Sequence, residues 1–334
     1  MKIEIITRLE EMAAVKKEWN DCLSLSSQNS VFLTFEWFYS WWKSFGEDQS
    51  LRILLFRDSR GVLNGIAPMM LTQQSLSFLA SREVTDYCDL IIPKGKEEEV
   101  IESFLIEIMA NRGEMDRLAL INIREESSTI PVLTRLAEKF DLPFTLEETE
   151  FALRLELPKV YESYVSQLSR KNRHELRRKV KKLEELSDVV IERISDPEKI
   201  RIHLETFIGL HRRSSPAKNR FWQKKGMAGF FEDVATFFSQ QGWMEFYLLS
   251  MDGQITASLL CFIYQNEVLF YNVAFDPNFA AFSPGIFLFN RAIERAIAEG
   301  IWRVDFLRGR EKYKYNFGAE ECKIRDFVLS LREK

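Results

Sequence analysis

A charged turn near the C-terminus holds the residue types that proton transfer and anion binding require. The run 304–318 reads VDFLRGREKYKYNFG, so an apolar stretch typical of a strand is followed by both charge signs and a phenol. The candidate residues are Asp305, Arg308, Glu311, Tyr313 and Lys314. Ionisable groups that cluster in this way favour a functional site. The alternative is a solvated loop, but the aromatic residues of the run favour a turn packed on the core.

A second segment, 276–285, reads DPNFAAFSPG and lies between a predicted strand and a predicted helix. Ser283 suits the N-cap, Pro284 suits the first helical position, and Gly285 lets another group approach closely. The free N–H groups and the dipole of such a helix end attract phosphate or pyrophosphate. Ordinary capping is the alternative interpretation. The segment has one glycine, so it is neither a Walker loop nor a GxGxxG loop.

A third segment, 170–182, reads RKNRHELRRKVKK and contains eight basic residues and one acidic residue, a local charge of +7 in a chain of net charge −4. Apolar residues at helical spacing predict a helix over 166–186 that packs one face on the body. Its basic face is either simply solvated or binds a phosphate-bearing substrate, tRNA or an anionic lipid headgroup. Arg173 and Arg177 are candidate phosphate contacts.

The remaining composition excludes several classes of protein. Lys and Arg total 46 against 50 for Asp and Glu, which does not indicate nucleic acid or a membrane surface as the main partner. The four cysteines and three histidines lack zinc-site spacing, and His203 and His211 have no carboxylate signature between them, so we expect no metal. No apolar run approaches the length of a membrane span. We expect a cytoplasmic protein with reduced thiols.

The elements that position these segments occur in two similar series. In the second half we predict strands over 245–250, 255–264, 268–275 and 302–307, with a helix over 285–299 before the last strand. In the first half we predict a hairpin of 51–56 and 62–71, a strand over 76–79, a helix over 97–110 and a strand over 118–123. Helices over 8–25 and 32–42 precede them, the second dense in core aromatics. We therefore predict two α/β (α+β) lobes, 1–150 and 151–334, joined near 145–160.

Taken together, these motifs resemble a known family. The runs 271–277 and 283–285, and the closing DFLRG-x-E-x-YK pattern from Asp305 to Lys314, resemble the GNAT-type acyltransferase domain of the CelD and BioF2-like group, which is related to the FemABX peptidyltransferases. Runs 32–42, 65–69 and 86–90 resemble the amino-terminal region of that group. The resemblance spans nearly the whole chain. It implies two tandem GNAT-like lobes, each a mixed, mainly antiparallel sheet flanked by helices, with the active site in the second.

The resemblance also implies roles for individual residues. Acyl-CoA, with an acetyl or a longer acyl group, would be the co-substrate, and no metal would be needed. Backbone donors near Ala274 and Phe275 would polarise the thioester carbonyl, and the turn of Ser283, Pro284 and Gly285 would hold the pyrophosphate. The segment 313–318 matches an FK-x-x-FG-like segment that belongs to the FemABX active site, and this match carries Lys314 over.

The remaining expected roles complete a reaction scheme. Asp305 or Glu311 would be the general base, and Tyr313 would protonate the leaving thiolate. Lys314 and Arg308, with Arg173 or Arg177, would hold substrate phosphates, and Asp86 and Tyr87 would also bind substrate. On the sequence alone, Lys314→Ala should abolish transfer with little change in thermal stability.

The predicted function is an N-acyltransferase acting on an amine of a sugar nucleotide or a cell-envelope or exopolysaccharide precursor. One alternative is a FemABX-like transferase that uses aminoacyl-tRNA, with the basic helix as the RNA contact. Another is an inactive GNAT-like module that binds a partner in exopolysaccharide assembly. The expected partners are accordingly a small-molecule or glycan-precursor acceptor, tRNA in the alternative reading, and an anionic membrane through peripheral contact.

Overall fold

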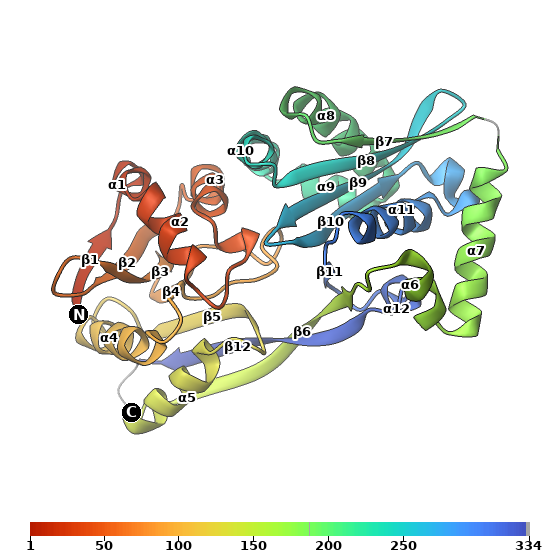
Figure 1. Ribbon diagram of the computed structural model, residues 1–334. Coiled ribbons are helices and arrows are strands. Elements are labelled where there is room, and N and C mark those ends of the chain that lie inside the picture. Colours follow the sequence, from red (N-terminus) through yellow and green to blue (C-terminus); the bar gives the residue numbers. More distant parts are fainter. Residues whose placement is uncertain (187, 332–334) are drawn as a thin grey trace. The chain divides into compact units, whose positions relative to one another are not determined.

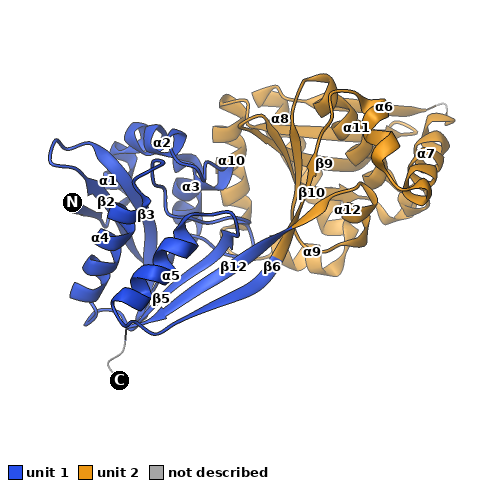
Figure 2. Cartoon of the chain, turned by 60° about the horizontal axis from the view of Figure 1, so that its bottom comes forward, with its two compact units in different colours: residues 1–150, 322–334 blue, residues 151–321 orange. Residues whose placement is uncertain are grey.

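The computed structural model describes residues 1–186 and 188–331. The chain divides into two compact units, coloured separately in Figure 2. The second unit consists of residues 151–321, and the first contains residues 1–150 together with the segment that begins at Cys322. The lobes expected from the sequence were 1–150 and 151–334, whereas the segment that begins at Cys322 packs with the first unit.

The first unit contains a mixed sheet in the order β1-β2-β3-β4-β5-β12 (Figure 1). The strands are β1 (Lys2–Ile6), β2 (Ser50–Arg57), β3 (Leu63–Thr72), β4 (Ser75–Phe78), β5 (Arg117–Arg124) and β12 (Glu320–Ser330). The hairpin of β2 and β3 was predicted. β4 and β5 run parallel because the helix α4 (Glu97–Ala110) connects them.

Helices of the first unit bury a dense set of aromatic rings. They are α1 (Leu9–Ala14), α2 (Lys16–Ser24), the short 3₁₀ helix η1 (Val31–Leu33), α3 (Phe35–Phe45), α4 and α5 (Thr129–Lys139). The single helix predicted over 8–25 is two helices because the backbone of Val15 leaves the helical region, at φ −98° and ψ 9°. Trp19, Phe32 and Trp37 are fully buried, so the aromatic run forms core.

The second unit has the same succession of elements. Its sheet has the order β6-β11-β10-β9-β8-β7, and β10 and β11 run parallel. The strands are β6 (Phe144–Glu156), β7 (Val189–Ile194), β8 (Met244–Met251), β9 (Gln254–Tyr264), β10 (Glu267–Phe275) and β11 (Arg303–Arg308). The helices are α6 (Tyr161–Gln167), α7 (Arg170–Glu184), α8 (Pro197–Ser214), α9 (Pro216–Trp222), α10 (Met227–Gln240), η2 (Pro277–Phe282), α11 (Pro284–Ala298) and α12 (Lys312–Asn316).

Strand alternation assigns these helices to two faces of the second sheet. Leu249 of β8 belongs to the core cluster that contains residues of α7 and α11. Phe246, three residues earlier, points to the other face, and its ring lies 5.5 Å from that of Phe207 on α8. Successive side chains of a strand point to opposite faces. Helices α7 and α11 therefore cover one face, and α8 covers the other.

The last strand of each series pairs with a strand from the other half of the chain. β6 follows the first series, yet its residues Ala152–Glu156 pair antiparallel with β11. β12 follows the second series, yet Ile324–Ser330 pair antiparallel with β5. The predicted internal doubling is confirmed, and the segment 145–160, expected to join the lobes, consists mostly of β6, within which the two units divide. The adjacent Glu147 and Glu148 interrupt the apolar–polar alternation that would indicate a strand.

The basic helix is shorter than predicted. Instead of one helix over 166–186, α6 and α7 are separated at Leu168, whose backbone is extended at φ −63° and ψ 145°. The Ser169 hydroxyl then accepts a hydrogen bond from the Asn172 N–H at 3.2 Å and caps α7. Leu176 and Leu183 are buried on the inner face of α7, which leaves its basic residues on the other faces, as expected.

Candidate active site

The central feature of the second unit is the place where β10 and β11 separate (Figure 1). The two strands pair only from Glu267 to Leu269 on β10, opposite Arg303 to Asp305 on β11. β10 has a bulge between Phe270 and Asn272 relative to β9 and continues to Phe275. A bulge bends a strand and often lies beside an active site. The edge of β10 after the bulge is therefore open to groups other than β11.

Aromatic rings lie where the strands separate. Phe270 of β10 lies 5.0 Å from Phe289 of α11 and 5.1 Å from Phe306 of β11, measured between ring centroids. The Tyr313 ring stacks on Phe289 at 5.3 Å with an interplanar angle of 13°. Burial raises the pKa of Tyr313, so its phenol stays protonated at neutral pH. A protonated phenol beside the separation point suits the proton-donor role expected from the sequence.

Lys314 holds the turn that follows β11. Its Nζ lies 2.6 Å from the Arg308 carbonyl oxygen and 3.2 Å from the carbonyl oxygens of both Leu307 and Gly309. It also lies 2.9 Å from Oε2 of Glu311. Only 3% of the Lys314 residue is exposed. The ammonium is thus committed to the turn, which places Lys314 in the site as a buried support and not as an exposed phosphate ligand.

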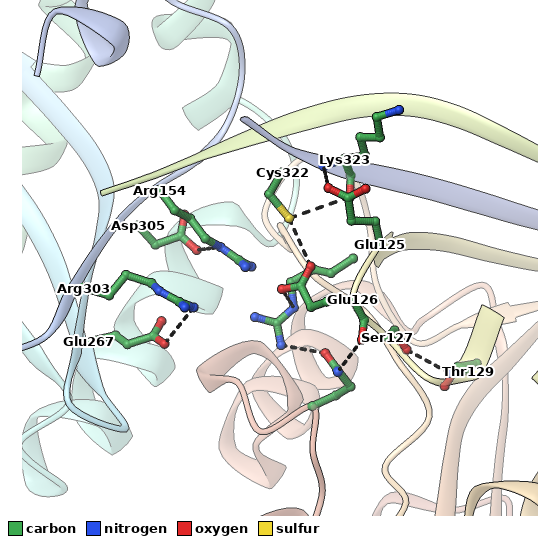
Figure 3. A network of polar contacts seen from close by, with 12 residues as sticks. Glu125, Glu126, Ser127, Thr129, Arg154, Glu267, Arg303, Asp305, Cys322 and Lys323 are labelled. Carbon is green, nitrogen blue, oxygen red and sulfur yellow. Dashed lines mark hydrogen bonds and ion pairs between the residues drawn. The ribbon is translucent and has the colours of Figure 1, made fainter. Parts of the chain in front are cut away.

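Asp305 also holds this turn, and Figure 3 shows its contact with Arg154. One carboxylate oxygen accepts the Leu307 N–H at 2.7 Å, and the other accepts Nε of Arg154 on β6 at 3.1 Å. Leu307 has a φ of 60°, and left-handed backbone in a bulky residue is strained and concentrates at functional sites. Of the two predicted bases, Asp305 is buried, whereas the side chain of Glu311 is 55% exposed.

The turn before α11 contacts the edge of β10. Ser283 occupies the N-cap position as predicted, but its hydroxyl makes no capping hydrogen bond because its backbone is left-handed at φ 53° and ψ 50°. Pro284 is the first helical residue. A Cβ atom on Gly285 would lie 3.4 Å from Cγ2 of Val273. The predicted pyrophosphate-binding turn therefore lies beside Val273.

Helix α7 lies against the same turn. Nζ of Lys182 donates to the Ala281 carbonyl oxygen at 2.9 Å and lies 4.8 Å from the centroid of the Phe282 ring. Arg173 is half-buried and Arg177 is exposed. Arg170, Arg173 and Arg177 follow at helical spacing and have no carboxylate partner among the described residues. The C-terminal end of α7 thus contacts the turn before α11 through Lys182, and arginines without carboxylate partners in the described chain lie along the rest of the helix.

A buried cluster that the sequence did not indicate lies on the α8 side of the sheet. Nδ1 of His211 accepts the indole N–H of Trp222 at 2.8 Å, so the proton of the ring is on Nε2, which faces Oδ1 of Asn272 at 2.8 Å. Burial lowers the pKa of His211 to about 4. His211 is therefore neutral with a fixed tautomer, and it ties α8 and α9 to the bulge of β10.

Two more side chains of this cluster bind the edge of β10. Nζ of Lys218 donates to the Val273 carbonyl oxygen at 2.6 Å. Oγ of Ser214 accepts the Phe275 N–H at 3.1 Å. The Phe275 N–H, expected from the resemblance to face the acyl carbonyl, thus has a partner on α8, and Ala274 is fully buried. Burial lowers the pKa of Lys218 to about 8. These residues are 55 and 61 positions from their partners, so no local pattern could have revealed them.

The remaining predicted substrate residues belong to the first unit. Tyr87 is buried, and the guanidinium of Arg124 lies 5.1 Å from its ring centroid. Asp86 is half-buried beside it in sequence. Within the part of the chain that the structure describes, no group of three His, Cys, Asp or Glu side chains could hold a metal ion. No helix of the described residues is long and apolar enough to cross a membrane.

Comparison with known proteins agrees with this geometry. Residues 170–315 match a family model described as an acetyltransferase (GNAT) domain. The structure of FemX is similar over 98% of this chain and 97% of its own, with a TM-score of 0.66 at 13% identity. A tandem GNAT protein from the clavulanic acid biosynthesis pathway covers 100% of both chains, with a TM-score of 0.54 at 9% identity. L-PGS from Bacillus licheniformis covers 95% of this chain and 91% of its own, with a TM-score of 0.59 at 13% identity. No curated protein sequence matches significantly.

The chain thus has a tandem GNAT fold related to that of FemX, and residues 170–315 of its second unit match the acetyltransferase (GNAT) domain. The protein is an acyltransferase. At identities of 9–13%, the solved structures establish the fold, and the substrates must be inferred from the site.

Proposed function

We propose that the protein transfers an acyl group from acyl-CoA to an amine of a sugar nucleotide or of a cell-envelope or exopolysaccharide precursor. The observation that carries the proposal is the contact between the turn of Ser283 to Gly285 and the open edge of β10 at Val273. The free N–H groups at the N-terminus of α11 would bind the pyrophosphate of acyl-CoA. Because this helix end lies next to the edge of β10, the thioester of the bound donor would lie where β10 and β11 separate.

The other groups of the site fit this reaction. Tyr313 is protonated and lies beside the separation point, where it would protonate the leaving thiolate. Lys182 and the unneutralised arginines of α7 would attract the phosphates of donor or acceptor. Asp305 and Glu311 each contact a cation, Arg154 and Lys314 respectively, and this pairing favours a role in shaping the turn.

A second candidate is an aminoacyl-tRNA-dependent transferase. It is favoured by the row of Arg170, Arg173 and Arg177 without carboxylate partners in the described chain, and by the similarity to FemX over 98% of the chain. RNA binding through such a row would weaken steeply with salt, because each neutralised phosphate releases counterions.

Calorimetry would separate the two candidates. Binding of acetyl-CoA, a longer acyl-CoA and bulk tRNA should be measured at two salt concentrations, with the Arg173→Glu/Arg177→Glu double variant and with Arg201→Glu as an exposed control on α8. We expect acyl-CoA to bind the wild type, followed by transfer to a UDP-linked amino sugar. Tight, salt-sensitive tRNA binding without acyl-CoA binding would favour the second candidate. Binding of neither donor would favour an inactive module.

A further inference from the structure

The edge of β10 beyond its bulge contacts the amine of Lys218, a residue that lies outside all three segments singled out from the sequence. We propose that the ε-amine of Lys218 accepts the proton of the attacking amine, and so acts as the general base of the transfer. The proposal rests on the proposed acyl transfer and adds to it a residue from α9, on the face of the sheet opposite α11.

Val273 joins Lys218 to the predicted donor turn. The carbonyl oxygen of Val273 holds Nζ of Lys218 at 2.6 Å, and its Cγ2 lies 3.4 Å from where a Cβ of Gly285 would be. One residue of β10 is thus in contact with the donor turn through its side chain and with the lysine through its backbone. An acyl group delivered along this edge would reach the neighbourhood of the Lys218 amine.

The surroundings of Lys218 allow it to be neutral. It is partly buried and makes no ion pair with a carboxylate in the described residues. His211 of α8 interacts electrostatically with Lys218 and is neutral, while β10 presents the backbone carbonyl of Val273. On the neighbouring helix α10, the ring of Phe231 lies 4.8 Å from that of Trp222 on α9. Burial without a counter-charge disfavours the ammonium form.

The other candidate bases are less suitable. The lone pair on Nδ1 of His211 is occupied by the Trp222 N–H, and Nε2 carries the proton. Both carboxylate oxygens of Asp305 are engaged, by Leu307 and Arg154. Glu311 contacts the ammonium of Lys314. His211 is therefore a positioning residue, since it ties α8 and α9 to Asn272 on the bulge.

The proton and bond changes balance as follows. The acceptor ammonium gives one proton to neutral Lys218, and the freed lone pair attacks the acyl carbon to form the C–N bond. Collapse of the tetrahedral intermediate breaks the C–S bond. The second proton of the nitrogen restores the phenol of Tyr313, which has protonated the thiolate. Lys218 then releases its proton to solvent. The sum is an amide, a free thiol and one proton.

The first test is the pH dependence of kcat/KM for transfer from acetyl-CoA or a longer acyl-CoA to a UDP-linked amino sugar. The wild-type rate should rise with pH and level off above about pH 8. Lys218→Met and Lys218→Arg should each lose about 100-fold or more, with unchanged affinity for acyl-CoA. Arg keeps a donor to Val273 but cannot take the proton. Lys199→Met, an exposed lysine of α8, should behave as the wild type. A wild-type rate in Lys218→Arg would overturn the proposal. So would a pH profile of kcat/KM that stays pH-dependent in Lys218→Met but becomes flat in Glu311→Gln.

The second test does not depend on turnover, so it separates a failure of this inference from a failure of the proposed function. The wild-type protein is treated briefly with acetic anhydride over a range of pH, and the acetylation of the Lys218 peptide is measured by mass spectrometry. Half-maximal reactivity near pH 8 would support the inference even if no acyl-CoA substrate is found. Half-maximal reactivity near the ordinary lysine value of about 10.4 would overturn it.

Discussion

The buried ammonium of Lys314 lies 2.6 Å from the carbonyl oxygen of Arg308, and it also binds the carbonyl oxygens on either side. One side chain of α12 thus fixes three consecutive residues of the turn after β11. The turn begins with the strained Leu307, at φ 60°, and ends at Gly309, at φ 106°. The conformation of the turn therefore depends on Lys314.

This relationship predicts that Lys314→Met loses both activity and stability. The methionine fills the space of the lysine stem but leaves buried carbonyl groups without a donor, and each such group costs about 1–3 kcal/mol. We expect the free energy of unfolding to fall by about 3 kcal/mol. Denaturant unfolding would measure it, with Lys312→Met, an exposed lysine of the same helix, as the control. An unchanged melt with lost transfer would return Lys314 to the purely catalytic role expected from the sequence.

Replacement of Gly285 and of Gly309 by alanine should affect stability differently. Gly285→Ala adds a Cβ at an ordinary 3.4 Å from Val273, so the melting temperature should stay near that of the wild type. If pyrophosphate rests on this turn, however, the methyl group should weaken acyl-CoA binding, which calorimetry would detect. Gly309→Ala requires φ 106° and meets Oε2 of Glu311 at 2.5 Å, so it should destabilise by about 1–3 kcal/mol. Equal stability of the two variants would contradict the described turn.

The buried Asp89 of the first unit predicts a pH dependence of stability. Burial raises the pKa of Asp89 from 3.8 to about 6, although the Leu90 N–H and the Thr129 hydroxyl donate to the carboxylate. Because the folded state binds the proton more tightly than the unfolded state, the contribution of Asp89 to stability grows as pH falls from about 7 to about 4. It is lost as pH rises through about 6. This change corresponds to about 3 kcal/mol.

Asp89→Asn should remove this dependence while keeping an acceptor for Leu90 and Thr129. The measurement is the difference in unfolding free energy between pH 4.5 and pH 7.5, in wild type and variant. We expect the variant to gain less than the wild type on acidification. The same difference in both proteins would show that Asp89 is not the group that titrates.

Because the C-terminal strand β12 completes the sheet of the first unit, we expect that residues 1–150 do not fold alone. Without β12, the strand β5 loses its partner at Ile324–Ser330, and the core loses the buried side chains of Phe327 and Leu329. Such an edge of β5 would favour aggregation. Attaching residues 320–331 through a flexible linker should restore a cooperative unfolding transition, which circular dichroism would record. A cooperative transition in the unextended fragment would contradict the prediction.

Local features of this sequence determined much of the fold. The hairpin of β2 and β3 follows from two apolar runs around a turn, and α4 begins and ends at the predicted residues 97 and 110. The turn of Asp305 to Lys314 was found for the same reason, because all its residues lie within ten positions. Periodicity and turn chemistry act between near neighbours, so a sequence reveals them.

The tertiary structure alone decided which distant residues meet. Lys218 reaches Val273 across 55 positions, and His211 reaches Asn272 across 61, because the bulge in β10 and the end of α8 bring them together. The sequence did not indicate the strand β6, because adjacent glutamates interrupt its alternation, and only its pairing with β11 identifies it. Contacts of this kind depend on strand order and register, which are properties of the whole fold and not of any short segment.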